Sequence, residues 1–329
     1  MSWRPELALS AGRTLIRERT ALSTGPVIRE VAMSAEVDQQ PIVVGVDGSV
    51  GSRAALGWAA DEATRRRAPL ELVHSWRPMY RAPHDVAGDS EAELVARDHG
   101  AWLLAAAAGS VKASAPQLVV TTSLLRGRPS AVLLDAAANA QLLVVGARGV
   151  GGYAGLSLGS VSLHVVSHSP SSVVVVRSAR EVGPVIVGID GSTESKAVLR
   201  VALDEARLRN SPLIAMCALF VHSRAEGVLD RERAFAAAQA NANYSLEQLL
   251  HGVSNEYDAI EITQSLPIGY PAEVLANASM GAQLLIVGSH GGGGFAGMKL
   301  GSIAHAVVHN AHCTVMIVRD QSSTHSSTH

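Results

Sequence analysis

The sequence predicts an α/β protein built from two tandem, doubly wound parallel sheets. Two observations lead to this prediction. A segment of about 140 residues occurs twice, and within each copy short Val/Ile/Leu runs alternate with helical patterns. Strands that are apolar along their whole length are buried on both faces, which is typical of parallel sheets covered by helices on both sides.

Three pairs of segments establish the duplication. PIVVGVDGSVGSRAALGWAADEA (41–63) returns as PVIVGIDGSTESKAVLRVALDEA (184–206), QLLVVGARGVGGYAGLSLGS (141–160) as QLLIVGSHGGGGFAGMKLGS (283–302), and SSVVVVR (171–177) as CTVMIVR (313–319). The copies lie 142 or 143 residues apart, which is too long for a solenoid repeat and indicates a duplicated domain. We expect domains over 39–180 and 181–320, a poorly ordered N-terminal extension over 1–38, and a disordered tail over 321–329.

Within the first copy, each element has its own pattern. The expected strands are the apolar runs 42–46, 70–73, 118–125, 142–145 and 172–176. A stripe of apolar residues at helical spacing predicts the helix after the first strand: Leu56, Ala59, Ala60 and Ala63, repeated as Leu199, Ala202, Leu203 and Ala206. Residues 91–108 and 130–140 are expected to form two further helices, and a fourth starts near Ser160, or Ser302 in the second copy.

A glycine-rich segment joins the fourth strand of each copy to the following helix. Gly146, Gly149, Gly159 and Ser160 have the same spacing as Gly288, Gly291, Gly301 and Ser302. The first N–H groups of a helix lack intrahelical partners and carry partial positive charge, so they favour phosphate. Glycine leaves room for a ligand and adopts positive φ freely. A flexible turn in which the serine only caps the helix remains the alternative.

An Asp-Gly-Ser turn follows the first strand of each copy. It places Asp47 and Asp190 at the carboxyl edge of the sheet, where the glycine segment also arrives and where doubly wound sheets bind ligands. A carboxylate can accept hydrogen bonds from ribose hydroxyls, or bind a cation that bridges phosphates. The same tripeptide also suits a simple turn or a helix cap, so a structural role stays open.

Taken together, these motifs resemble the ATP-binding branch of the universal stress protein family, in the tandem form known from actinobacteria. The family signature is Gly, two residues, Gly, nine residues, then Gly followed by Ser or Thr, and both copies match it. The resemblance covers about residues 41–320. It implies a five-stranded parallel sheet per domain with ATP at the carboxyl edge, and Mg²⁺ only as a companion of the phosphates.

The resemblance also implies which residues meet the nucleotide. In the first domain these are Gly45, Asp47 and the backbone of Ser75, after the second strand, for adenosine, and Gly146, Gly149, Gly159, Ser160 and Val161 for the phosphates. The corresponding residues of the second domain are Gly188, Asp190, Ala218, Gly288, Gly291, Gly301, Ser302 and Ile303. The loops differ at Arg148 against His290 and at Ser157 against Lys299. A cation there could favour phosphate and make the two sites unequal in affinity, but solvated loop side chains are the favoured interpretation.

The function implied is that of an ATP-binding regulator of growth or survival under stress. No GxxxxGK[ST] motif, phosphate-gripping lysine or water-positioning base accompanies the matched site, so we expect no catalytic residues. A slow ATPase or nucleotide-processing enzyme is the alternative, and a structural interaction protein with empty sites is a third.

Composition limits the partners. The net charge of -2 gives no general attraction to nucleic acid or to an anionic membrane, and no apolar run is long enough to span a bilayer. The two cysteines are too few for a disulfide framework or a metal cluster, and we expect a cytoplasmic protein without a metal site. The last strands, 171–177 and 313–319, are expected at sheet edges, where unpaired backbone groups invite another strand. The family resemblance implies that these two strands pair with each other to form an internal pseudo-dimer. A homodimer of the whole chain is left open.

Overall fold

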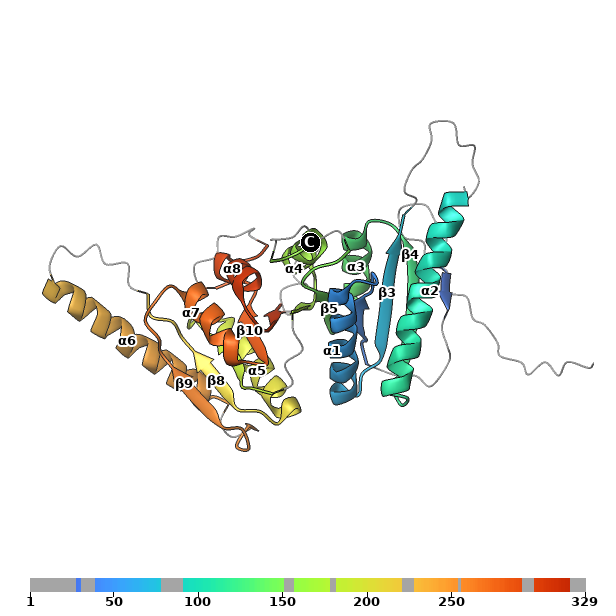
Figure 1. Cartoon of the computed structure of the whole chain (residues 1–329). Helices are drawn as coiled ribbons and strands as arrows, with labels where there is room; N and C mark the ends of the chain where they lie inside the picture. Colours follow the sequence, from blue (N-terminus) through green and yellow to red (C-terminus); the bar gives the residue numbers. More distant parts are fainter. Residues whose placement is uncertain are drawn as a thin grey trace, which may run out of the picture.

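The computed structural model describes residues 28–30, 39–77, 91–150, 157–177, 182–220, 228–253, 256–291 and 299–319. Strands and helices alternate through both copies of the repeat, as the sequence predicts (Figure 1). The first domain contains β2 (Ile42–Gly45), α1 (Val50–Arg66), β3 (Leu70–Trp76), α2 (Glu91–Ser114), β4 (Val120–Arg126), α3 (Pro129–Ala137), β5 (Leu142–Gly146), α4 (Ser160–His168) and β6 (Ser172–Val176).

The second domain repeats this order. It contains β7 (Val185–Gly188), α5 (Ser195–Arg209), β8 (Leu213–Met216), α6 (Val228–His251), β9 (Ile262–Ser265), α7 (Pro271–Ala278), β10 (Leu284–Gly288), α8 (Ser302–Asn310) and β11 (Thr314–Val318), with a 3-10 turn at Ser279–Gly281. The strands of each domain are parallel, in the orders β4-β3-β2-β5-β6 and β9-β8-β7-β10-β11. The chain therefore winds first to one side of β2 or β7 and then to the other, which confirms the doubly wound prediction.

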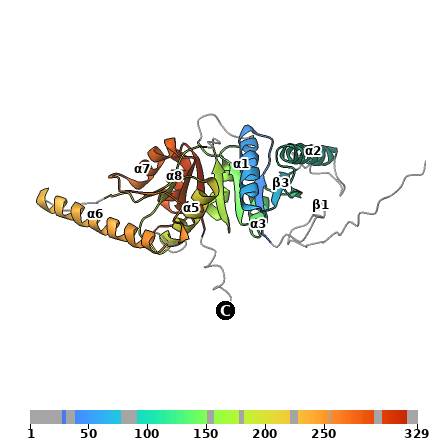
Figure 2. The same cartoon turned by 90° about the horizontal axis from the view of Figure 1, so that it is seen from below.

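The two five-stranded sheets are halves of one larger sheet. Strand β6 pairs antiparallel with β11, with Val175 opposite Val315 and Val173 opposite Ile317. The expected pairing of the last strands is thus confirmed, and it covers the edge that each domain would otherwise leave open. Figure 2 shows the two halves side by side, with α2 and α6 at opposite ends of the molecule.

A short strand lies within the stretch that we expected to be poorly ordered. Strand β1 (Ile28–Glu30) pairs antiparallel with β4, with Ile28 opposite Leu124. The backbone groups of the edge strand β4 offer these three residues hydrogen-bond partners that no local sequence pattern reveals. The rest of the predicted extension and the predicted tail, 321–329, lie outside the described residues.

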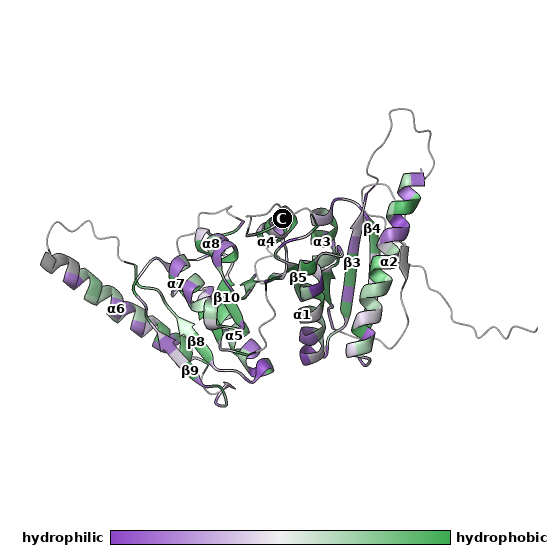
Figure 3. Ribbon diagram, viewed as in Figure 1, coloured by the Kyte–Doolittle hydropathy of each residue, from purple (hydrophilic) through white to green (hydrophobic). Residues whose placement is uncertain are grey.

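The sheet has a hydrophobic core on each face, and both cores cross the boundary between the domains. Helices α1, α2, α5 and α6 cover one face, where Val174 and Met316 belong to the same buried cluster. Helices α3, α4, α7 and α8 cover the other face, where Val173 and Val315 do so. Figure 3 shows hydrophobic colour along β5 and β10 and hydrophilic stretches on the helices around them. The domains therefore share their apolar interior as well as their backbone hydrogen bonds.

Four charged side chains are buried where α1 meets α5. Arg66 donates to Glu62 of its own helix at 2.5 Å and to Glu205 of the other domain. Arg209 in turn binds Glu205 of its own helix and Glu62 across the boundary, the latter at 2.6 Å. Both glutamate side chains have no exposed surface. Each arginine thus bridges the two domains, and we call these four residues the interdomain charge cluster.

Burial raises the pKa of Glu205 to about 7, and the nearby Glu62 carboxylate acts in the same direction. Burial also opposes ionisation of Glu62, but Arg209 and Arg66 outweigh it and lower the pKa of that carboxyl. The folded protein therefore holds a proton on Glu205 that the unfolded chain releases near pH 4.5. The stability contributed by this proton is complete below pH 4.5 and is lost as the pH rises through about 7.

A Glu205→Gln variant should remove this pH dependence. Between about pH 5 and pH 8, the free energy of unfolding of the unchanged protein should fall relative to that of the variant, because only the carboxyl group titrates. Urea unfolding of both proteins across this range measures the difference. Parallel pH profiles would show that Glu205 titrates at its ordinary pKa.

Candidate functional site

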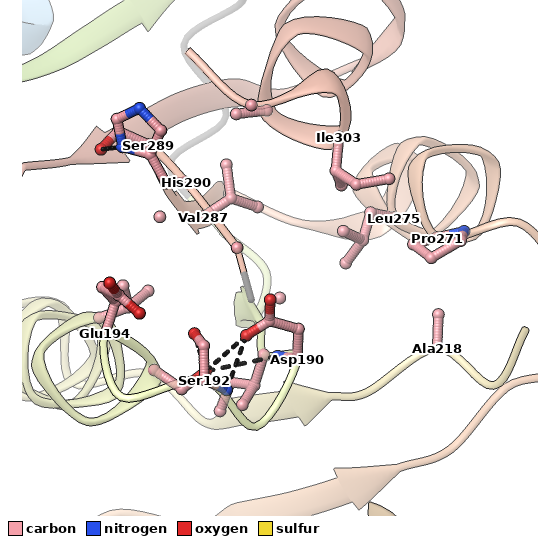
Figure 4. Close-up of a pocket in the computed structure, with 18 of the residues that line it drawn as sticks. Asp190, Ser192, Glu194, Ala218, Pro271, Leu275, Val287, Ser289, His290 and Ile303 are labelled. Carbon is pink, nitrogen blue, oxygen red and sulfur yellow. Dashed lines mark hydrogen bonds between the residues drawn. The ribbon is translucent and has the colours of Figure 1, made fainter. Parts of the chain in front are cut away.

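A cavity of about 390 Å³ lies in the second domain at the carboxyl ends of β7 and β10 (Figure 4). The strand order reverses between these two strands, which is where doubly wound sheets bind ligands. The volume is within the range of small-molecule sites. All eight residues predicted for the second domain line the cavity: Gly188, Asp190, Ala218, Gly288, Gly291, Gly301, Ser302 and Ile303. The structure thus gathers them in one place, and their ligand contacts remain predictions.

The carboxylate of Asp190 is held by the start of the next helix. Its Oδ1 accepts hydrogen bonds from the backbone N–H of Ser192 at 3.0 Å and from the hydroxyl of Ser195 at 2.9 Å. A Cβ added to Gly291 would lie only 2.5 Å from Asp190 Oδ2. The second glycine of the motif is therefore required so that the loop and the carboxylate can meet.

The first domain repeats this contact between aspartate and loop. A Cβ on Gly149 would lie 2.4 Å from Asp47 Oδ2, and that oxygen accepts a hydrogen bond from the N–H of Val150 at 3.1 Å. Partial burial opposes ionisation of Asp47, but hydrogen bonds from Ser49, Ser52 and Val150 outweigh it and lower the pKa of its carboxyl. Asp47 is therefore an anion at neutral pH.

The glycine segments end on helix N-termini as predicted, but glycine and not serine occupies the cap position. Gly159 and Gly301 are the N-caps of α4 and α8, and neither helix has a side-chain cap hydrogen bond. The N–H of each cap donates to the loop, at 2.8 Å to Ala147 and Ser289 respectively. Ser160 and Ser302 are the first helical residues, so the cap alternative for these hydroxyls is wrong.

The conformational freedom of glycine is used at a different place from the one we expected. The φ of Gly159 is -79° and that of Gly301 is -66°, both accessible to any residue. Positive φ instead occurs at Gly48 and Gly191, each 79°, in the two Asp-Gly-Ser turns. An Asp-Gly pair in a turn is a signal for this conformation that the sequence already carried.

The cavity has an apolar and a polar part. Figure 4 shows Pro271, Leu275 and Ile303 at one end and Glu194 at the other. The titratable residues of the lining are Asp190, Glu194, Cys217 and His290. Among the described residues of the lining there is no lysine or arginine, so there the groups suited to bind an anion are backbone N–H groups. Such a pocket suits a ligand that combines an apolar ring with an anionic group.

The two domains differ most at one position of the first helix. Gly51 occupies in the first domain the place that Glu194 has in the second. A Cβ on Gly51 would lie 2.1 Å from the carbonyl oxygen of Arg148, so the backbone after β5 packs directly onto the start of α1. Glu194 instead lines the open cavity of the second domain. The two candidate sites therefore differ in shape, in addition to the sequence differences at Arg148 against His290 and Ser157 against Lys299.

The remaining predicted residues of the first domain have structural partners. Ser75 lies within β3 and not after it, because that strand continues to Trp76, and its hydroxyl donates to the carbonyl of Gly127 at 2.7 Å. Gly45 and Gly188 end their strands beside leucines, with added Cβ atoms 3.2 Å from Leu133 and 2.9 Å from Leu275. These two glycines make room for α3 and α7. Val161 lies in α4, and Gly146 is the last residue of β5.

Comparison with known proteins agrees with this architecture. The family model described as universal stress protein family matches residues 39–177 and 181–319. The chain belongs to the universal stress protein family. Universal stress protein Rv2005c of Mycobacterium tuberculosis (strain ATCC 25618 / H37Rv) is 35% identical over 301 residues, which cover 87% of this chain and 99% of that protein. Universal stress protein Rv2623 of the same strain is 33% identical over 300 residues, with coverage of 88% and 99%.

A solved structure supports the fold of this universal stress protein. The universal stress protein from Archaeoglobus fulgidus DSM 4304 superposes with a TM-score of 0.61 at 17% identity, covering 85% of this chain and 97% of that one. At this identity the likeness concerns the fold alone. The mycobacterial relatives match along almost their whole length, so the tandem arrangement is common to them and to this chain.

Sequence reasoning missed several residues of the cavity in this universal stress protein. Ser195 fixes Asp190, Glu194 lines the polar end, and Leu275 lies at the apolar end. A serine five residues after the aspartate recurs as Ser52, and this repetition could have indicated its role. Among the described residues, no group of three or more His, Cys, Asp or Glu is placed to hold a metal ion. The helices of the same residues include none with the length and apolar character of a membrane span.

Proposed function

We propose that this universal stress protein is an ATP-binding regulator, in which nucleotide occupancy couples stress to growth control or survival. The observation that supports this most directly is the cavity of the second domain, which is lined by all eight residues predicted there for ATP. These residues come from the ends of three strands and the start of a helix. They could bind one ligand only if they line the same pocket.

We propose a place in the lining for each part of ATP. The adenine ring fits the apolar end beside Ala218, Pro271 and Leu275. The carboxylate of Asp190 is suited to accept a hydrogen bond from a ribose hydroxyl. The phosphates fit the first turn of α8, where the N–H groups of Ser302 and Ile303 have no intrahelical partners. Mg²⁺ carried by the phosphates would offset the charges of Asp190 and Glu194.

The same lining supports binding over catalysis. Enzymes that transfer phosphoryl groups neutralise developing charge with lysine, arginine or a tightly held metal, and the lining residues that the structure describes include neither lysine nor arginine. We therefore propose that ATP hydrolysis is slow or negligible, and that the ATP-bound protein is itself the regulatory state. The alternative, a slow ATPase, would be indicated by steady phosphate release well above buffer that is lost on replacement of Asp47 or Asp190.

The test is to denature the freshly purified protein, identify any released nucleotide by mass spectrometry, and titrate nucleotide-free protein with ATP by calorimetry. We expect ATP in the released fraction, approaching two per chain if both domains bind. Asp190→Ala should weaken binding in the second domain by roughly 10-fold to 150-fold, the loss of one hydrogen bond to a charged group. Asp204→Ala, at a partly exposed position on α5 that does not line the cavity, is the control. No binding at millimolar ATP would refute the proposal and favour a structural interaction protein with empty sites.

A further inference from the structure

An arginine at the end of the last strand in each domain crosses to the other domain. Arg177, directly after β6, donates through Nη2 to the carbonyls of Val308 and His309, the latter at 3.0 Å. Its Nη1 donates to the carbonyl of Ser157 at 3.1 Å. One guanidinium thus joins the last turn of α8 in the second domain to the loop that leads into α4 in the first.

Arg319 makes the mirror-image set of contacts. Its Nη2 donates to the carbonyls of Val166 at 2.6 Å and Ser167 at 3.0 Å, in the last turn of α4. Its Nη1 donates to the carbonyl of Lys299 at 2.9 Å. Every partner of Arg319 is the repeat counterpart of a partner of Arg177, 142 residues away. The pseudo-twofold relation between the domains therefore includes these contacts.

The chemistry of the contacts makes them specific. The last carbonyls of a helix lack intrahelical donors and carry partial negative charge, which a cation stabilises. The planar guanidinium can donate to two elements at once, which an ammonium group cannot do with the same geometry. Burial lowers the pKa of both arginines, and their Nε atoms are buried with no hydrogen-bond partner in the part of the chain that the structure describes. The desolvated charges depend on the carbonyls that they contact.

Both arginines hold residues adjacent to the candidate nucleotide sites. Ser157 is two residues before Gly159, the cap of α4, and Lys299 is two residues before Gly301, the cap of α8. Helix α8 begins in the cavity of the second domain and ends at Arg177. A second contact reinforces this connection, since the Ser157 hydroxyl lies 3.1 Å from Nδ1 of His309.

We infer that Arg177 and Arg319 are positioning residues that couple the two candidate nucleotide sites across the domain boundary. A ligand that orders the start of α8 also orders the last turn of that helix, and through Arg177 the loop at Ser157 in the first domain. A ligand that orders the start of α4 acts in the same way through Arg319 on the loop at Lys299 in the second domain. Binding at either site thus favours binding at the other, by about 5-fold or more in affinity. The nucleotide part of this inference rests on the proposed function, whereas the connection through the arginines does not.

The first experiment uses the full chain without nucleotide. Hydrogen exchange followed by mass spectrometry is compared among the unchanged protein, Arg177→Gln and the control Arg207→Gln, an exposed arginine paired with Asp204. We expect Arg177→Gln to speed exchange in peptides from both domains, covering 157–163 and 305–311, and the control to change neither. Arg177→Lys keeps the positive charge but lacks the planar guanidinium that can donate to two elements at once. This variant replaces Arg177→Gln if the glutamine variant does not fold. Faster exchange in only one domain would overturn the inference.

The second experiment adds ATP to a Gly159→Val chain, in which only the second domain is expected to bind. Exchange should slow in α8 and also in α4 of the first domain, and the slowing in α4 should disappear when Arg177→Gln and Arg319→Gln are both added, because Arg319 joins Lys299 directly to the last turn of α4. Slowing of α4 that survives both replacements, or slowing confined to α8, would overturn the coupling. Absence of any response to ATP would refute nucleotide binding and the coupling of sites with it, while the ligand-free comparison would still decide whether the arginines connect the domains.

Discussion

A Gly301→Val variant is expected to lose ATP binding in the second domain while keeping its fold. Gly301 lines the cavity and caps α8 with φ -66° and ψ 153°, an extended conformation that valine adopts readily. A Cβ there would lie 3.4 Å from the carbonyl oxygen of Ser289, at the limit of ordinary contact. The added side chain should therefore occupy the place where we propose that phosphate binds, without straining the backbone.

Nucleotide released on denaturation measures this effect, and it should fall by one ATP per chain relative to a protein with both sites filled. Gly281→Val is the matched control, because a Cβ at Gly281 has open space around it and this residue does not line the cavity. Circular dichroism and the unfolding midpoint report on the fold of both variants. An unchanged ratio of ATP to protein in Gly301→Val would contradict the assignment of the phosphate site. The corresponding variant of the first domain is Gly159→Val, whose φ of -79° is equally permissive.

Replacing Arg209 with methionine should lower the free energy of unfolding by about 3–5 kcal/mol at pH 8. The Arg209 side chain is 4% exposed and binds Glu62 and Glu205, whose side chains have no exposed surface. Methionine retains most of the apolar stem and loses the guanidinium group, whose carbon lies 5.5 Å from the centre of the Trp58 ring. The loss is therefore mainly that of leaving buried carboxylates without their counter-charge.

The same substitution on the surface provides the control. Arg207 lies on the same helix, its side chain is 61% exposed, and it pairs with Asp204. Arg207→Met should change the free energy of unfolding by less than about 1 kcal/mol. Urea unfolding of the two variants measures the contrast, which should shrink near pH 5, where Glu205 is protonated. Equal effects of the two variants would show that the interdomain charge cluster contributes little beyond a surface pair.

The elements of the fold were predictable because each has a local pattern. Continuous apolar runs identified the five strands of the first domain, although β3 continues to Trp76 and β4 is shifted from the predicted 118–125 to Val120–Arg126. The stripe from Leu56 to Ala63 identified α1, and all four of its residues are buried. Strand β1 could not be predicted, because three residues on an open sheet edge need only backbone hydrogen bonds and no side-chain pattern.

The candidate site was predictable only in part. The repeated glycine spacing, the Asp-Gly-Ser turns and the family resemblance together predicted eight of the residues that line the cavity of the second domain, because strand ends and helix starts converge at the edge of a doubly wound sheet. The difference between Gly51 and Glu194 decides how closely the loop packs on the first helix, and this depends on a contact with Arg148 that spans 97 residues of the chain. No local pattern records such a contact.

The sequence by itself determined the duplication, the order of strands and helices, and the positions of the two glycine segments, because repetition and periodicity are properties of neighbouring residues. The tertiary structure alone decided the antiparallel register in which β6 and β11 pair, that Glu62 and Glu205 are buried with two arginines, and that Arg177 and Arg319 cross between the domains. From their positions on a helix or directly after a strand, these charged residues would be expected to be exposed to solvent. They become interior only when the antiparallel pairing of β6 and β11 brings the second domain against the first.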